Sequence, residues 1–450
     1  MTAIVCSCGL NGLALTRALS RHGVRVLTTD SRRDVGAFSR HGLFSVCPDP
    51  LVDEFGFVLH VLRLASHCPD RPIVFATNDH FVAALSRHAE VLRDRAELCA
   101  ADWGVVRILL HKQAFATWAA ERGYRVPKTR RLCDTDASHN HPYPVILKPE
   151  CRRTASGDGG SPALAETLDR NRLLVVGSHE ELVDVRLRLG PQLDRYVVQE
   201  YVPGLSDQMY TVGVYVAGNH EVTALFSGRK IRGYPPDHGD CMVGQSDIVP
   251  HHVEEIARNI CRDIGYSGLA EFEFKRHPAT GEYILLEVNP RSWSWIGVCA
   301  ACGVDLAWEA YCDLRADMPR RTMQMDVSPG DVKWVRILDD PLNCLWRNAS
   351  SGYSEWKLSP LDWLRSLRCR RLVIAEWEPG DSAPLVYAVM RIVIAVVARV
   401  RRLVRNRAHP RREGSRWTVA SDTKIATSAA QYSCQARVQS VQNKSSGCNP

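Results

Sequence analysis

The sequence predicts an α/β domain, then a larger α+β domain, then a helical extension. Strands and helices alternate through the first hundred residues, which is typical of a small parallel sheet. From Tyr143 onward, strand-like segments pair across short turns, which favours antiparallel sheets. We therefore expect domains over residues 1–105 and 106–317, an extension over 318–412, and a polar, disordered tail over 413–450.

The positive charge of the chain is concentrated near its C-terminal end. The formal net charge is +7, and eight arginines but no acidic residue lie between Leu385 and Arg412. Without these arginines the net charge is −1. A main body without excess positive charge argues against nucleic acid as a partner.

The start of the chain does not have the pattern of a secretory signal. No basic segment follows Met1, and Ser7, Gly9 and Asn11 interrupt the first apolar stretch. The 16 cysteines then indicate free thiols in a reducing compartment, and we expect a cytoplasmic protein.

The first domain opens with a predicted strand, Ala3–Cys6, and a helix near Asn11–His22. The segment Cys8–Ala14 has two glycines but not the complete G-x-G-x-x-G, which favours a tight turn and argues against a dehydrogenase. A later strand, Ile73–Ala76, ends before Asn78–Asp79. Because ligands bind at the carboxyl ends of parallel strands, that pair could contact a small substrate.

The second domain is expected to hold most of the antiparallel strands. Predicted strands are Val145–Leu147, Tyr196–Gln199, Tyr210–Val216, Glu221–Phe226, Leu269–Phe274 and Tyr283–Val288, and predicted helices are Lys112–Arg122, His179–Leu189 and Val253–Ile264.

Acidic residues on a predicted hairpin form the strongest candidate site. Strand alternation places Glu271, Glu273 and Lys275 on one face. The hairpin then folds Glu287 and Asn289 back against that face. Carboxylate and amide oxygens are ligands that Mg²⁺ prefers. The alternative is a solvated hairpin with acids placed by chance, but it does not explain why Asn-Pro-Arg directly follows an apolar strand.

Two other segments suggest contacts with a nucleotide. Lys148 ends an apolar strand, where burial is costly unless an anion pairs with it. The glycine-rich Ser156–Ser161 follows, and its N–H groups could close over phosphates. Val197–Gly204 ends in a Pro-Gly turn that could offer backbone groups to a flat base, with Asp207 near for a ribose.

In this order, the three segments resemble the ATP-grasp superfamily from about Lys112 to Asp313. The likeness is to carboxylate–amine ligases related to biotin carboxylase, carbamoyl-phosphate synthetase and D-aspartate ligase. The first hundred residues resemble the domain that precedes the grasp in that family. The resemblance implies a two-lobed ATP-grasp domain, ATP and Mg²⁺ (or Mn²⁺) as cofactors, and small-molecule carboxylate and amine substrates.

The resemblance also implies roles for individual residues. The metal ligands would be Glu273, Glu287 and Asn289, and the nucleotide would be contacted by Lys112, Lys148, Glu200, Tyr201, Val202 and Asp207. Arg291 would lie beside the acyl phosphate, and the segment Gly228–Arg232 near the reacting carboxylate. Of its basic residues Arg229, Lys230 and Arg232, at least one should face the site, and Arg229 is favoured because its guanidinium can bind a carboxylate at two points.

A ligase of this kind transfers the γ-phosphoryl group of ATP to a carboxylate, and an amine attacks the resulting acyl phosphate. The alternative is an ATP-binding regulatory protein of the same fold without ligase activity. The patterns do not identify the acid, the amine or the oligomeric state.

The C-terminal extension carries weaker signals. Val332–Leu338 is a possible strand, and Leu385–Val404 is a predicted helix whose charge-free stretch is shorter than the ~20 residues that span a bilayer. A basic amphipathic helix could dock on the protein, which we favour, or make a weak contact with an anionic membrane surface.

Overall fold

The computed structural model describes most of the chain before residue 409. The described residues are 1–134, 142–151, 164, 165, 168, 173–236, 239–315, 325–347 and 357–408, with backbone alone at 399, 400 and 402–408. The glycine-rich segment Ser156–Ser161 and the expected tail over 413–450 lie outside these residues.

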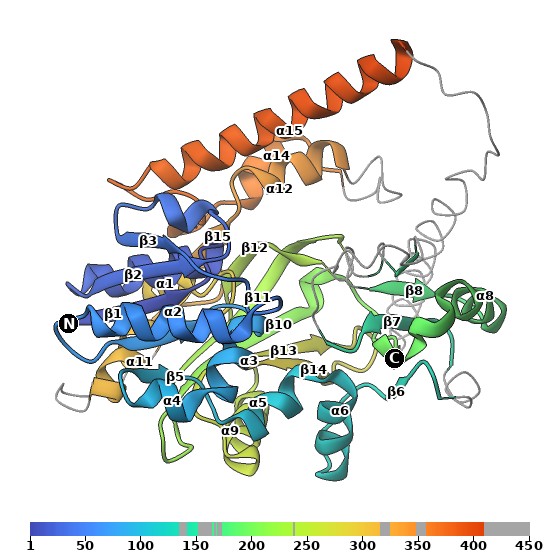
Figure 1. Cartoon of the computed structure of the whole chain (residues 1–450). Helices are drawn as coiled ribbons and strands as arrows, with labels where there is room; N and C mark the ends of the chain where they lie inside the picture. The colour runs from blue at the N-terminus through green and yellow to red at the C-terminus, as the bar shows by residue number, and fades with distance from the viewer. Residues whose placement is uncertain are drawn as a thin grey trace.

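Five parallel strands form the N-terminal sheet, in the order β3-β2-β1-β4-β5 (Figure 1). The strands are β1 Thr2–Cys6, β2 Arg25–Asp30, β3 Gly42–Val46, β4 Ile73–Ala76 and β5 Glu97–Cys99. The helices are α1 Leu10–Arg21, α2 Glu54–Ser66, α3 Asp79–Arg87, α4 Ala89–Arg93 and α5 Trp103–Leu110, with a 3-10 turn, η1 Val35–Phe38. The predicted small parallel sheet is therefore confirmed.

The glycine pair that follows β1 has a packing role. Only Ser7–Gly9 separate β1 from α1. A Cβ atom on Gly12 would lie 2.0 Å from the carbonyl oxygen of Ser7, so this close approach of helix and turn requires glycine.

Two antiparallel sheets follow, and Figure 1 shows the smaller one beside one end of the larger. The small sheet has the order β6-β9-β7-β8, with β6 Thr129–Arg131, β7 Val145–Pro149, β8 Leu174–Val176 and β9 Tyr196–Glu200. The large sheet has the order β14-β13-β10-β11-β12-β15-β16. Its strands are β10 Met209–Val216, β11 Val222–Tyr234, β12 Asp240–Ser246, β13 Gly268–Arg276, β14 Tyr283–Asn289, β15 Val332–Val335 and β16 Arg371–Ile374.

Helices and short helical turns complete these two domains. The helices are α6 Lys112–Glu121, α8 His179–Leu189, α9 His251–Ile264, α10 Gly297–Ala301, α11 Leu306–Arg315, α12 Asp339–Leu342, α14 Pro360–Ser366 and α15 Ala383–Ala408. The turns are η3 Gly190–Arg195, η4 Ser206–Gln208 and the π-helical η5 Asn343–Arg347.

The hydrophobic cores join the N-terminal sheet to the large sheet but not to the small one. One core contains Ile4 and Val74 together with Val212 and Phe272, so it runs from β1 and β4 into β10 and β13. The core of the small sheet draws only on residues between Leu132 and Val198. The small sheet is therefore a separate lobe, whereas the N-terminal domain and the large sheet share their packing.

The predicted boundary at residue 317 does not separate two structural units. β15 pairs antiparallel with β12, and β16 pairs parallel with β15, so segments of the expected extension complete the large sheet. The possible strand at Val332–Leu338 is present as β15, although it ends at Val335. No strand was predicted at β16, whose four residues are too few for alternation to be recognised in the sequence.

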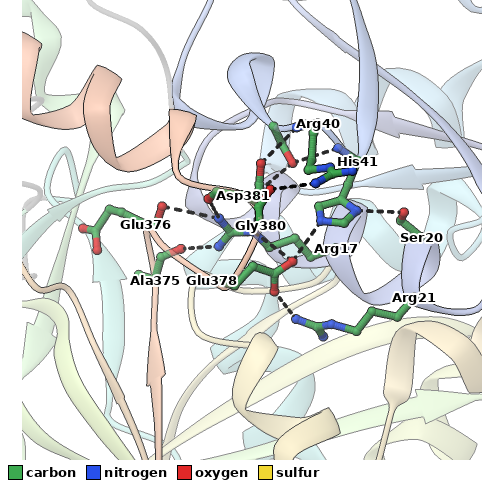
Figure 2. A network of polar contacts seen from close by, with 11 residues as sticks. Arg17, Ser20, Arg21, Arg40, His41, Ala375, Glu376, Glu378, Gly380 and Asp381 are labelled. Carbon is green, nitrogen blue, oxygen red and sulfur yellow. Dashed lines mark hydrogen bonds and ion pairs between the residues drawn. The ribbon is translucent and has the colours of Figure 1, made fainter.

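A buried arginine fastens the C-terminal segment to the N-terminal domain (Figure 2). Arg17 on α1 lies with its Nε 2.9 Å from the Asp381 carboxylate and donates to the carbonyl oxygens of Ala375 and Glu376. Asp381 also accepts from the Ser39 hydroxyl and the Arg40 N–H. The side chain of Asp381 is 1% exposed, so every charge in this contact is paired away from water.

The helix α15 starts directly after this contact, and it confirms the predicted C-terminal helix. Its first turns pack on η1, where Tyr387 stacks on Phe38 with the ring centroids 4.1 Å apart. Of the helices that the structure describes, none has both the length and the apolar character to cross a membrane.

Replacing Asp381 with asparagine should destabilise the protein by about 1.5–3 kcal/mol, because the buried Arg17 guanidinium loses the nearer of its two carboxylates and keeps only Glu378, 3.6 Å from its Nε. Thermal unfolding of the purified variant measures this loss. As a control, Asp184→Asn removes an exposed pair with Arg188 on α8, and we expect less than about 0.5 kcal/mol.

The effect should also depend on pH. Burial alone would raise the pKa of Asp381, but hydrogen bonds from Arg40, Ser39 and Arg17 lower it below its ordinary value. A carboxyl group with a lowered folded-state pKa stabilises the fold above its unfolded pKa of about 4 and loses that contribution as the pH falls. The difference in melting temperature between wild type and Asp381→Asn should therefore become smaller below pH ~4. An unchanged difference would show that the ionised Asp381 carboxylate does not stabilise the fold.

Candidate active site

The acidic residues meet where β13 pairs with β14. Glu273 lies opposite Glu287, and Glu271 lies opposite Asn289. The predicted hairpin is thus present, and it brings the carboxylates onto one face of the large sheet. That these residues hold a metal stays a prediction.

Hydrogen bonds link the acidic residues to two cations. Lys230 Nζ lies 2.9 Å from Glu273 Oε2. Asn289 Nδ2 donates to Glu271 at 3.1 Å and to Glu273 at 3.4 Å. Arg291 Nη2 donates to Asn289 Oδ1 at 3.1 Å. One amide side chain therefore connects the acids of β13 to the arginine that follows β14.

Burial and mutual charge shift the protonation of this cluster. Burial, and then the charge of Glu273, raise the pKa of Glu271 to about 8. Burial alone would lower the pKa of Lys230, but the carboxylates of Glu273 and Glu271 raise it above its ordinary value. Lys230 therefore stays positively charged at neutral pH, and the carboxyl group of Glu271 takes up a proton more readily than an exposed glutamate.

Lys148 and Lys112 lie close to this cluster. Lys148 is near the end of β7, and Lys112 begins α6 with its Nζ 3.5 Å from the carbonyl oxygen of Glu150. Burial, and then the charge of Lys112, lower the pKa of Lys148, while Glu287 acts in the opposite direction. The two lysines bring positive charge from the small sheet and α6 to the acids of the large sheet.

Of the basic residues on β11, Lys230 and not Arg229 faces the acids. Arg229 is paired with Tyr210, whereas Gly228 is paired with Thr211, and Thr211 is in turn opposite Glu273. Directly paired residues share a face, so alternation places Arg229 on the other side of the sheet. The expectation that Arg229 faces the site is not met.

The two arginines of β11, Arg229 and Arg232, form ion pairs away from the acidic cluster. The Nε atom of Arg229 lies 2.9 Å from Asp247, and its guanidinium lies over the Tyr210 ring. Arg232 forms an ion pair with the buried Asp340 after a register shift in the β11–β12 pairing. The expected strand ended at Phe226, but β11 continues to Tyr234 and carries all three cations.

The residues expected to bind adenine follow β9. Glu200 is held by Lys128, whose N–H donates to its carboxylate at 3.1 Å. Lys275 lies over the ring of Tyr201. Val202 is buried, and within the described part of the chain its backbone has no hydrogen-bond partner. Asp207 lies on η4, half-buried. Their contact with a nucleotide stays a prediction.

The sequence did not identify the contacts that the N-terminal domain makes with the loop after β14. Arg291 Nε lies 2.5 Å from Asp79 at the start of α3. Asn11 donates to the carbonyl oxygens of Thr77 and Ser292 and accepts from the Ser292 hydroxyl. The sequence drew attention to Asp79 because it lies at the carboxyl end of a strand, where a small substrate could bind. In the structure Asp79 instead forms an ion pair with Arg291.

A pocket lies beside the cluster. Its polar lining comes from Asp79, Lys112, Gln199, Glu287 and Asn289, and its apolar lining comes largely from α5, α6 and β14. The pocket therefore brings two predicted metal ligands and one predicted phosphate lysine to a common space between the small sheet, the large sheet and the N-terminal domain.

Parts of this sequence are similar to known proteins. Residues 246–311, which include β13 and β14, match the family described as carbamoyl-phosphate synthase L chain, ATP binding domain. D-aspartate ligase of Enterococcus faecium (strain Aus0004) is 24% identical over 253 residues. That match covers 52% of this chain and 58% of the ligase, so this chain spans less than two thirds of that relative's length.

Solved structures give the same fold. The biotin carboxylase domain of the Hydrogenobacter thermophilus 2-oxoglutarate carboxylase, in complex with MgADP, superposes with a TM-score of 0.54 at 15% identity over 72% of each chain. This chain has an ATP-grasp-like fold. The L-amino acid ligase from Bacillus licheniformis has a TM-score of 0.51 at 15% identity, covering 70% of this chain and 74% of the ligase. The predicted ATP-grasp architecture is thereby confirmed, with the small and large sheets as its two lobes.

Replacing Asp79 with asparagine should lower the stability by about 1.5–3 kcal/mol, because a hydrogen bond between charged groups is lost while Arg291 stays buried. Thermal unfolding measures the change. The control Asp102→Asn removes a pair with Arg93 in which the acid is 75% exposed, and we expect less than about 1 kcal/mol. Equal effects of the two substitutions would show that Asp79 does not hold Arg291.

Proposed function

We propose that this chain is an ATP-dependent ligase that activates a carboxylate as an acyl phosphate for attack by an amine. The observation that carries the proposal is the pairing of Glu273 with Glu287 across β13 and β14, with Lys230 and Arg291 on either side. The family match over this hairpin, the D-aspartate ligase relative and the L-amino acid ligase fold support it.

The donor atoms of the hairpin suit a magnesium ion. Glu273 and Glu287 offer carboxylate oxygens, and none of the three predicted ligands is a soft sulfur or imidazole. The amide oxygen of Asn289 accepts from Arg291 here, so the amide would have to turn to bind the ion together with the carboxylates. When bound with ATP, Mg²⁺ would neutralise charge on the phosphate oxygens. The MgADP bound to the biotin carboxylase domain supports this assignment.

The lysines at the junction of the lobes are the proposed phosphate contacts. Lys148 is half-buried at the end of β7, where the charge of Lys112 opposes its protonation and those of Glu287 and Glu273 favour it, and a phosphate would add a further counter-charge. The adenine would lie against the segment after β9, where Val202 can offer backbone N–H and C=O groups. Asp207 is the proposed ribose contact.

The reaction has two steps. A carboxylate oxygen of the acid attacks the γ-phosphorus of ATP, the bond to the β–γ bridging oxygen breaks, and ADP leaves. The amine nitrogen then attacks the acyl carbon, inorganic phosphate leaves, and the amine loses a proton. Arg291 and Lys230 are the residues placed to stabilise negative charge on the phosphoryl group during both steps.

A regulatory protein that binds ATP without ligase activity is the second candidate. Release of ADP by the purified protein in screens of amino acids and small carboxylates separates the two. Release that depends on both an acid and an amine supports the ligase. ATP binding without release under any pair of substrates favours the regulatory protein.

Glu287→Gln should reduce ATP turnover by at least about 100-fold, since an amide of the same size replaces a proposed metal-binding carboxylate. ADP release at saturating Mg²⁺ is the measurement. The matched control is Glu282→Gln in the exposed turn before β14, which should keep wild-type turnover. Normal turnover by Glu287→Gln would remove this residue from the site.

Lys230→Met should lower kcat by about 100-fold or more, because a positive charge beside the acids is lost. Arg229→Met, one residue away on the other face of β11, should leave kcat and the KM for the acid close to wild type. Steady-state kinetics with ATP and with the acid as the varied substrate show which of the two substitutions impairs the reaction. A larger effect of Arg229→Met would mean that the acid is bound on the opposite face.

A further inference from the structure

The two halves of α15 have different surroundings. Its first turns are docked: Tyr387 stacks on Phe38 and donates to the carbonyl oxygen of Arg33, and Arg391 pairs with Asp34. From Val393 to Ala398 every side chain is exposed. The helix therefore leaves the surface of the protein after about two turns, and in Figure 1 it runs along the edge of the molecule.

One face of α15, between Val386 and Val397, is exposed and strongly apolar, including in the turns whose opposite face is docked. Its exposed large side chains are 42–63% accessible and are Val386, Val389, Met390, Val393, Ile394, Val396 and Val397. At 100° per residue these positions fall within about half of the helix circumference. Residues of this kind on one face of a helix mark a surface that is covered by another apolar medium or molecule.

The charge around this face indicates what covers it. Five arginines follow the apolar segment within α15, at positions 399, 401, 402, 405 and 407, and no acidic residue lies between 385 and 412. A second copy of α15 would add the same positive charges without an acid to pair with them. An anionic surface with an apolar interior satisfies both the arginines and the exposed side chains.

We propose that α15 binds to an anionic lipid surface, with the apolar face between Val386 and Val397 inserted at the headgroup boundary and the following arginines bound to phosphates. The helix lies in the interface and does not cross it, in agreement with its length of apolar sequence. The proposal is independent of the ligase reaction, because α15 contributes no residue to the candidate active site.

The test is co-sedimentation of the full chain with vesicles of phosphatidylcholine alone or of phosphatidylcholine mixed with phosphatidylglycerol. We expect binding to the anionic vesicles to exceed binding to the neutral ones by about tenfold or more and to fall as salt increases. The double variant Val393→Asp/Ile394→Asp should lose this binding. The control Leu187→Asp, at a 78% exposed position on α8, should keep it.

A second variant separates charge from apolar burial. Arg401→Gln/Arg402→Gln should weaken binding to anionic vesicles by about tenfold or more while leaving the weak binding to neutral vesicles unchanged. Circular dichroism and melting temperature should match wild type for all variants, because the substituted positions are exposed or lie beyond the docked turns. Equal binding to both vesicle types, full binding by the aspartate variant, or a concentration-dependent dimer that the aspartate variant abolishes without any vesicle binding would each overturn the proposal.

Discussion

The ion pair between Asp79 and Arg291 is the contact on which the candidate site depends. Arg291 has its charge buried, and the N-terminal domain supplies its nearest counter-charge. Arg291 in turn fixes Asn289, and Asn289 reaches both Glu271 and Glu273. A chain of hydrogen bonds therefore runs from the end of the first sheet to the acids of the large sheet. The β13–β14 pairing sets Glu273 opposite Glu287, and the N-terminal domain orients Arg291 and Asn289 beside them.

The charges of the site are balanced across three elements. The large sheet brings the acids and Lys230, while the small sheet and α6 bring Lys148 and Lys112. The pKa of Lys230 is raised because the charges of Glu273 and Glu271 outweigh its burial. The pKa of Lys148 is lowered because its burial outweighs the opposing charge of Glu287, with a smaller contribution from Lys112. A polyanion that entered between the lobes would favour the charged form of Lys148. Within the part of the chain that the structure describes, the cations of the site that have no carboxylate hydrogen-bonded to them, Lys148 and Lys112, thus lie on the side of the small sheet and α6.

The sequence predicted the elements whose pattern is local. The hairpin of β13 and β14 could be predicted because alternation and a turn suffice to bring Glu273 opposite Glu287. The contacts of Asn11 and Asp79 with the Asn289–Ser292 loop could not, because they join residues more than 200 positions apart. Arg229 was favoured for the chemistry of its side chain, yet alternation along β11 decided in favour of Lys230. Strand geometry was the stronger constraint there, since a one-residue shift reverses the face.

The C-terminal segment is tied to the same domain that orients Arg291. The ion pair between Arg17 and Asp381 is buried, and Asp381 lies immediately before the first turn of α15. Because Tyr387 and Arg391 add contacts to η1 over the next turns, the helix leaves the protein from a fixed point and in a fixed direction. Neither this ion pair nor the contacts of Tyr387 and Arg391 involve the small sheet, whose core is separate. The small sheet therefore takes no part in holding α15, and whatever α15 binds is linked through these contacts to the N-terminal domain and the large sheet rather than to the lobe that would carry the phosphate lysine.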